Sequence, residues 1–162
     1  MTTHRIPHIP ALLLAAAAAM SANAWAAGTT HDHGPAHATA AKPLPAGQRW
    51  ATDAPLREGM GRIRAALEPQ LKAVHHDKLG AEEYKALAAQ TEQQVAHIVA
   101  NCKLAPEADA ALHGILAQIG EATEAMAGKS KAKPRDGAVK LVAALDEYGR
   151  SFDHPGWKKL HR

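Results

Sequence analysis

The side chains of this sequence most able to do chemistry are its histidines, its methionines and its single cysteine. Three histidines lie close together near the start, in the pattern His31-x-His33-x-x-x-His37. Imidazole, thioether and thiolate groups are the ligands that copper prefers, Cu(I) above all, whereas zinc would accept the histidines and the cysteine alone. Short His-rich tracts often bind metal ions, so this pattern predicts a metal-capture segment.

Cys102 is the only cysteine, which excludes an intramolecular disulfide. Packing must therefore hold the fold together. A single cysteine also excludes the C-x-x-C-H motif of covalent haem attachment. In an oxidising compartment, a lone cysteine indicates a buried thiol, an intermolecular disulfide or a metal ligand, and the sequence leaves these three open.

The first 26 residues have the layout of a secretory signal peptide. Arg5 comes early, an apolar run follows from Ala11 to Met20, and A-x-A cleavage sites follow at Ala22-Asn23-Ala24 and Ala24-Trp25-Ala26. The apolar run is shorter than the roughly 20 residues that a membrane helix needs, so an uncleaved anchor is the weaker alternative. We expect residues 1–26 to be removed and the mature protein to be periplasmic, with no membrane segment.

The charge balance gives no support for a nucleic-acid partner. The whole chain has a formal net charge of +3, and removal of residues 1–26 takes away Arg5 and no acidic residue. We find no carboxylate pair with an obvious acid–base role, no Gly-rich phosphate loop and no nucleophile elbow. The sequence therefore does not predict an enzyme.

Residues 27–49 contain Gly, Thr, Pro and Ala but almost no large apolar side chains, which predicts a flexible tail. From residue 50 to residue 162, four stretches carry apolar residues at spacings of three and four, which is typical of helices. Thr52 or Asp53 would cap the first helix, Pro69 would kink it, and residues 128–137 would form a loop before the fourth. The four stripes are Leu56, Met60, Ile63, Leu67, Leu71 and Val74; Tyr84, Leu87, Thr91, Val95, Ile98 and Cys102; Leu112, Ile115, Ile119, Ala122 and Met126; and Val139, Val142, Leu145, Tyr148 and Phe152.

No window shows sustained alternation of apolar and polar residues, so the sequence predicts an all-α protein. Four helices joined by short loops favour an antiparallel up-down-up-down four-helix bundle. With a rise of about 1.5 Å per residue, matching the helix ends brings several chemistry-bearing residues to one level near the end that the tail joins. We therefore expect a copper site built from the tail and that end of the bundle, with the candidate ligands His31, His33, His37, Met60, His97, Cys102 and His113.

Each of the bundle residues also has a simpler interpretation. Met60 and Cys102 lie on apolar stripes, where both residue types commonly fill a core. His97 and His113 lie beside their stripes, so they could face each other across a helix seam or stand half-exposed at the surface. His154 could cap the end of the last helix, where a cation meets the helix dipole favourably.

The stretch Leu56-Arg-Glu-Gly-Met60-Gly-Arg-Ile63-Arg-Ala-Ala-Leu67 resembles the first helix of the cytochrome b562 family. These are periplasmic four-helix bundles with signal peptides, in which a methionine at this place is an axial haem ligand. The segments from His113 to Ile119 and from Tyr148 to His154 are also similar, and the likeness spans residues 53–154. The resemblance implies a b-type haem electron carrier with Met60 and His154 as the haem ligands.

The end of the last helix departs from that family's pattern. The family's second haem ligand is a histidine directly after an aromatic residue, whereas here Asp153 stands between Phe152 and His154. One extra residue turns a side chain by about 100° around a helix axis. The segments from Ile98 to Leu104 and from Pro106 to His113 also resemble a poorly characterised group of exported proteobacterial helical proteins. A third hypothesis is therefore a cofactor-free protein whose partner is another envelope protein.

Overall fold

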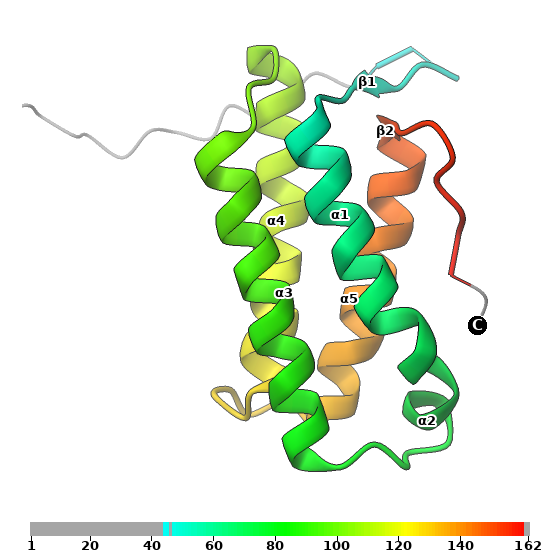
Figure 1. The fold of residues 1–162 in the computed structure, drawn as a ribbon, viewed down its shortest axis with the longest axis vertical. Helices are drawn as coiled ribbons and strands as arrows, with labels where there is room; N and C mark the ends of the chain where they lie inside the picture. Colours follow the sequence, from blue (N-terminus) through cyan, green and yellow to red (C-terminus); the bar gives the residue numbers. More distant parts are fainter. Residues whose placement is uncertain (1–43, 46, 161–162) are drawn as a thin grey trace, which may run out of the picture. The chain divides into compact units, whose positions relative to one another are not determined.

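A computed structural model describes residues 44–45 and 47–160 (Figure 1). The chain divides into two units, residues 1–36 and residues 37–162, and every described residue belongs to the second. The predicted signal peptide and the tail histidines His31, His33 and His37 lie outside the described residues.

Most of the described chain is α-helical, which confirms the prediction of an all-α protein. The long helices are α1 (Ala54–Leu67), α3 (Ala81–Asn101), α4 (Pro106–Met126) and α5 (Pro134–Ser151). They lie side by side, and the chain reverses direction at each connection (Figure 1). α1 packs on α3, α3 on α4, and α4 on α5. Among the described residues, no helix is both long and apolar enough for a membrane span.

Pro69 ends the first helix rather than merely kinking it. α1 stops at Leu67, a 3-10 turn (Glu68–Gln70) follows, and the short helix α2 (Leu71–His75) completes the stretch. Proline has no N–H to donate, and its ring clashes with the preceding turn, so the α-helical hydrogen bonds do not pass through this point. The predicted stripe survives the break, because Leu71 and Val74 are both buried.

α5 begins at Pro134, so the predicted loop over residues 128–137 is too long. Proline suits the first helical turn, because its fixed φ is already helical and its missing N–H would have had no partner there. The predicted loop includes Gly137, but this glycine is the point where α5 meets α4. A Cβ at Gly137 would lie 2.6 Å from the carbonyl oxygen of Ala122 and 2.9 Å from the backbone nitrogen of Met126.

Nearly all residues of the predicted apolar stripes are buried or partly buried; Val139 is the exception, with 47% of its surface exposed. The buried face of α5 is formed instead by residues at spacings of three and four, namely Ala138, Leu141 and Leu145. Val139 follows Ala138 and is turned from it by about 100°. The β-branched valine suggested a buried position that it does not have. The small alanine before it occupies the core position instead.

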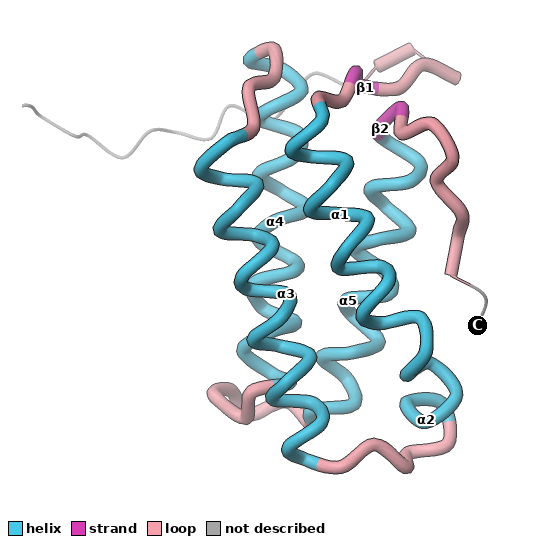
Figure 2. Tube along the Cα trace, viewed as in Figure 1, coloured by secondary structure: helices cyan, strands magenta, loops and turns pink. Residues whose placement is uncertain are grey.

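The structure contains a short pair of strands that the sequence does not predict. β1 (Trp50–Ala51) pairs in parallel with β2 (Phe152–Asp153), with Trp50 opposite Phe152 (Figure 2). Thr52 Oγ1 adds a hydrogen bond to the Asp153 carbonyl oxygen at 2.7 Å. Two-residue strands are too short to show alternation in a sequence. This pairing fastens the start of α1 to the end of α5.

Gly137→Ala should destabilise the protein by about 1–3 kcal/mol, because the added methyl group meets backbone atoms that have little freedom to move. Gly114→Ala is the matched control, since a Cβ at this exposed position in α4 meets nothing within 4 Å. Higher helix propensity should raise the stability of that variant by up to about 1 kcal/mol. Urea unfolding followed by circular dichroism measures both, and equal effects would contradict the close approach of α4 and α5.

Candidate functional site

The four bundle residues predicted as metal ligands have different surroundings. Met60 has no exposed surface and lies in the core beside the rest of the α1 stripe. His113 lies on the outside of α4 with a side chain that is 67% exposed. Its Nδ1 atom is 2.9 Å from the carbonyl oxygen of Asp109, one turn earlier in the same helix.

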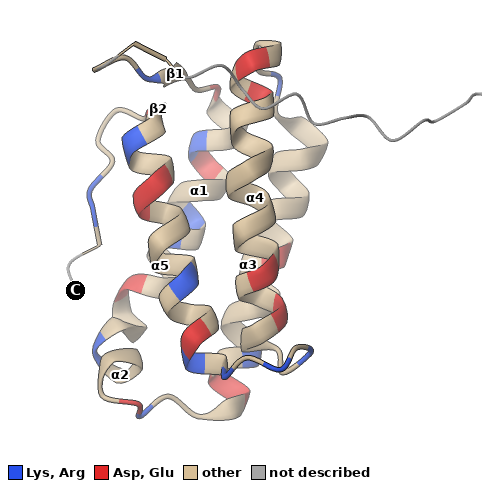
Figure 3. Ribbon diagram, turned by 180° about the vertical axis from the view of Figure 1, so that it is seen from behind, with Lys and Arg blue, Asp and Glu red and all other residues tan. Residues whose placement is uncertain are grey.

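Between Asp109 and Glu121 the surface of α4 carries no charged residue (Figure 3).

His97 lies on the seam between α1 and α3, where the two helices approach closely. A Cβ at Gly59 would lie 2.4 Å from the side chain of Ile98, so the glycine permits this approach. The Nε2 atom of His97 is buried, has no hydrogen-bond partner among the described residues, and lies 3.8 Å from Glu58 Oε2. Of the four candidate ligands, His97 is the one with a buried ring nitrogen that lacks a hydrogen-bond partner among the described residues.

Cys102 lies one turn beyond His97 on the same seam and is paired with Asp53. Its Sγ donates a hydrogen bond to Asp53 Oδ1 at 3.4 Å. Burial raises the pKa of Cys102 to about 12, helped by the hydrogen bond to Asp53 and the negative charge of that carboxylate. Cys102 is therefore a protonated thiol at neutral pH, and a metal would have to displace both its proton and its bond to Asp53.

Asp53 holds several backbone groups at once. Its carboxylate accepts hydrogen bonds from the N–H of Leu56 at 2.9 Å, which caps α1, and from the N–H of Lys103 at 2.6 Å. Burial alone would raise the pKa of Asp53, but these bonds, the Cys102 thiol and the positive charge of Arg57 outweigh it and hold the pKa below its ordinary value. The sequence identified Asp53 only as a possible cap, because its contacts with the end of α3 depend on the packing.

His154 is paired with Tyr148 at the same end of the bundle. Its Nδ1 atom lies 2.8 Å from the Tyr148 hydroxyl. Trp157 covers the pair, with its ring 4.8 Å from that of Tyr148 and seated over Gly149, where a Cβ would lie 2.3 Å from the indole nitrogen. Burial, with the positive charge of Arg57, lowers the pKa of His154, so the imidazole is neutral at neutral pH.

The residues around Met60 and His154 do not fit a haem held between them. Met60, Tyr148 and Phe152 have no exposed surface, and the rings of Tyr148 and Phe152 stack at 5.3 Å. A porphyrin bound by both ligands would have to displace this aromatic packing and the cover that Trp157 provides. The side chains as packed therefore leave no space for a haem at this end.

The structure does bring two donor pairs together, Asp53 with Cys102 and Glu58 with His97. Both pairs join α1 to α3, and they are five residues apart along each helix, a separation of about 7.5 Å. We call this end of the bundle, with Asp53, Cys102 and His154, the capped end. Within residues 44–45 and 47–160, no group of three or more His, Cys, Asp or Glu side chains is arranged to hold a metal ion.

Comparisons of this chain with protein-family models, with curated proteins and with solved structures gave no match.

Cys102 should react slowly with iodoacetamide, because a thiol with a pKa of about 12 is almost entirely protonated at pH 8. Asp53→Asn keeps a residue that can cap α1 and removes the negative charge, so alkylation should become at least about tenfold faster. Mass spectrometry of the folded protein measures the rate. Glu107→Gln, in the first turn of α4, is the control and should react as the wild type does; equal rates for all three proteins would contradict the role of Asp53.

The stability of the protein should fall as the pH is lowered from about 7 to 5. The pKa of His154 lies below its ordinary value of 6.5 in the folded protein. The unfolded chain therefore binds more protons in this range, and the stability contribution is present above pH 6.5 and is lost as the pH falls through the folded pKa. Urea unfolding at several pH values measures this. His154→Asn should flatten the profile, and a profile that this substitution does not alter would contradict the assignment to His154.

Proposed function

We propose that this chain is an exported periplasmic protein with an up-down-up-down four-helix bundle, and that it binds a metal ion, with copper favoured. The primary ligands in this proposal are His31, His33 and His37. The observation that carries it is their spacing in a segment with almost no large apolar residues, where a structural reason for three histidines is lacking. Imidazole sites bind Cu(II) more tightly than they bind the other common divalent metal ions, and this order of affinity favours copper.

The position at which the tail joins the bundle supports a contribution from the bundle itself. A hollow of about 270 Å³ at the capped end is lined by Trp50, Asp53, Lys103 and other residues, so the segment before α1 lies beside the residue after Cys102. His37 precedes Trp50 by 13 positions. We therefore include ligands from this end of the bundle in the proposal.

His97 is the bundle residue best suited to complete such a site, because its Nε2 atom has no hydrogen-bond partner among the described residues and Glu58 lies beside it. Cys102 is the second choice, since Asp53 holds its thiol in the protonated form. Met60 and His113 are left out of the proposed site. Met60 is enclosed by the core, and His113 lies on the exposed outside of α4, with its Nδ1 atom beside the Asp109 carbonyl oxygen of its own helix.

A cofactor-free interaction protein of the envelope is the second candidate function. The uncharged outer surface of α4 between Asp109 and Glu121 favours it, because interfaces between proteins are depleted of charged residues. A b-type haem carrier using Met60 and His154 is the third possibility, and it requires the aromatic residues at the capped end to move.

A competition titration of the mature chain with Cu(I) and Cu(II) should show tight binding. Replacement of His31, His33 and His37 by Ala should weaken that binding at least about 100-fold, because most of the ligands are lost. His97→Ala should weaken it by about tenfold, as expected for the loss of one ligand. His75→Ala with His76→Ala, at the end of α2 and just beyond it, is the matched control and should bind as the wild type does.

Unchanged copper affinity in the tail variant would contradict the proposal. A hemin titration of the same protein separates the alternatives. A sharp Soret shift that is lost in Met60→Ala would support the haem carrier, and a protein that responds to neither ligand would support the interaction protein.

A further inference from the structure

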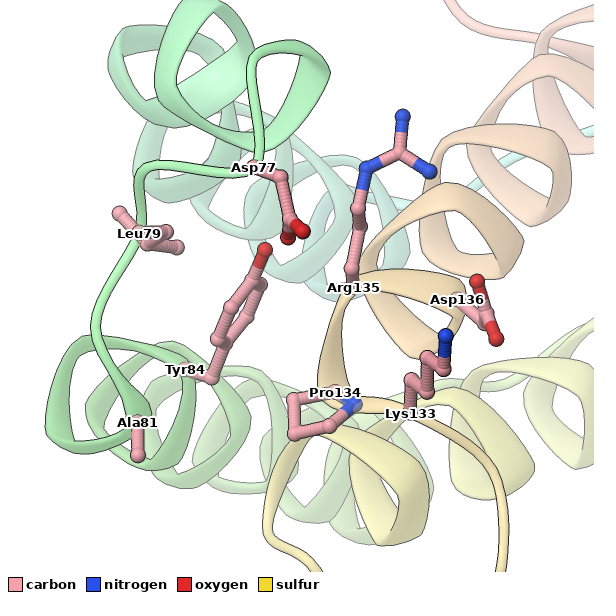
Figure 4. Close-up of a pocket in the computed structure, with 8 residues that line it drawn as sticks. All are labelled: Asp77, Leu79, Ala81, Tyr84, Lys133, Pro134, Arg135 and Asp136. Atoms are coloured by element: carbon pink, nitrogen blue, oxygen red, sulfur yellow. The ribbon is translucent and has the colours of Figure 1, made fainter.

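A hollow of about 390 Å³ lies at the other end of the bundle, which we call the far end (Figure 4). Its residues come from the loop after α2, from the start of α3 and from the start of α5. Both acidic and basic side chains line it, beside one tyrosine and a few small apolar side chains. The residues used in the argument are Asp77, Leu79, Tyr84, Lys133, Arg135 and Asp136.

Tyr84 is the feature of this hollow that points to a ligand. Only 4% of its surface is exposed, and its hydroxyl is buried without a hydrogen-bond partner among the described residues. Figure 4 shows the side chain standing in the hollow with the hydroxyl directed toward the loop of Asp77. A buried polar group without a partner is costly, so a molecule in the hollow is expected to supply one.

The tyrosine is a neutral phenol that both donates and accepts hydrogen bonds. Burial raises the pKa of Tyr84, the negative charges of Asp77 and Asp136 add to this, and the positive charge of Arg135 opposes it. These three charged groups therefore act on the same hydroxyl. A ligand that reaches Tyr84 meets charges of both signs.

The charged groups around the hydroxyl are only partly engaged by the protein. Arg135 donates hydrogen bonds from Nε to the Val74 carbonyl oxygen at 3.0 Å and from Nη2 to that of His75 at 3.4 Å, which anchors it at the end of α2. No hydrogen bond or ion pair to the side chains of Asp77, Asp136 or Lys133 is made within residues 44–45 and 47–160. Two carboxylates and one ammonium group thus remain available at the rim.

We propose that the far-end hollow binds a small zwitterion of the amino-acid class. Its ammonium group would lie against Asp77 and the Tyr84 hydroxyl, and its carboxylate against Lys133 on the other side of Arg135. The formal charges of the two acidic and two basic side chains of the hollow sum to zero. A ligand with a single charge is therefore repelled by two of these groups, whereas a zwitterion offers a charge of each sign. Leu79 gives the hollow an apolar side chain, and its volume is in the range of small-molecule sites.

This site lies at the opposite end of the bundle from Asp53, Cys102 and His154, and the proposal is independent of metal binding. The test is a titration of the full-length mature chain with L-alanine, followed by amide NMR shifts. We expect saturable shifts in residues 77–84 and 133–137, with a dissociation constant below about 1 mM. Tyr84→Phe, which removes only the hydroxyl, should weaken binding about tenfold, and Asp77→Asn should have a similar effect.

Lys133→Gln tests the carboxylate contact at an exposed position where the fold should tolerate the change, and it should also weaken binding about tenfold. Lys131→Gln, in the same loop but outside the hollow, is the matched control and should bind as the wild type does. Absence of saturable shifts in the wild type, where water alone satisfies the hydroxyl, would overturn the proposal. So would wild-type affinity for L-alanine in both Tyr84→Phe and Lys133→Gln, or binding of acetate or ethylamine as tight as that of L-alanine.

Discussion

The carboxylate of Asp53 is the constraint on which the arrangement of the capped end depends. It accepts hydrogen bonds from the N–H of Leu56, from the N–H of Lys103 and from the thiol of Cys102, so one side chain both starts α1 and joins it to the end of α3. With these groups fixed, the register of α1 against α3 is set. Gly59 then permits the close approach, and Met60 faces the core while Glu58 faces His97.

The same constraint explains why soft donors that lie near one another do not form an open metal site. Within the described residues, the thiol of Cys102 is bonded to Asp53, and the imidazole of His154 is bonded to Tyr148. Burial favours the uncharged form of each donor, since it raises the pKa of Cys102 and lowers that of His154. A donor that is already satisfied stabilises the fold, and a metal must compete with that partner. His97 differs, because its Nε2 atom faces a carboxylate without a hydrogen bond.

The sequence predicted the helices well because their apolar stripes repeat at the helical period, and burial follows that period from Leu56 to Val74. The sequence did not predict local structure that depends on a single contact between distant segments. Examples are the contact of Gly137 with α4 and the pairing of Trp50 with Phe152. The candidate site shows the same division. The number of residues along a helix predicts the level of a side chain, but its direction depends on about 100° of rotation per residue and on local partners. His113 illustrates this, because its ring bonds to the carbonyl of Asp109 in its own helix.

The polar residues buried among the helices explain why a ligand is expected at the far end. Thr91 and Thr123 are short, so each hydroxyl bonds to a carbonyl oxygen of its own helix at 2.8 Å. A tyrosine hydroxyl extends too far from its backbone to do this and must find a partner on another segment. Tyr148 finds His154 at the capped end. Tyr84 has no such partner among the described residues, although charged groups of both signs surround it. Within the described residues the protein provides charges around this hydroxyl but no hydrogen bond to it, which is the physical basis for proposing a ligand of matching charge at the far end.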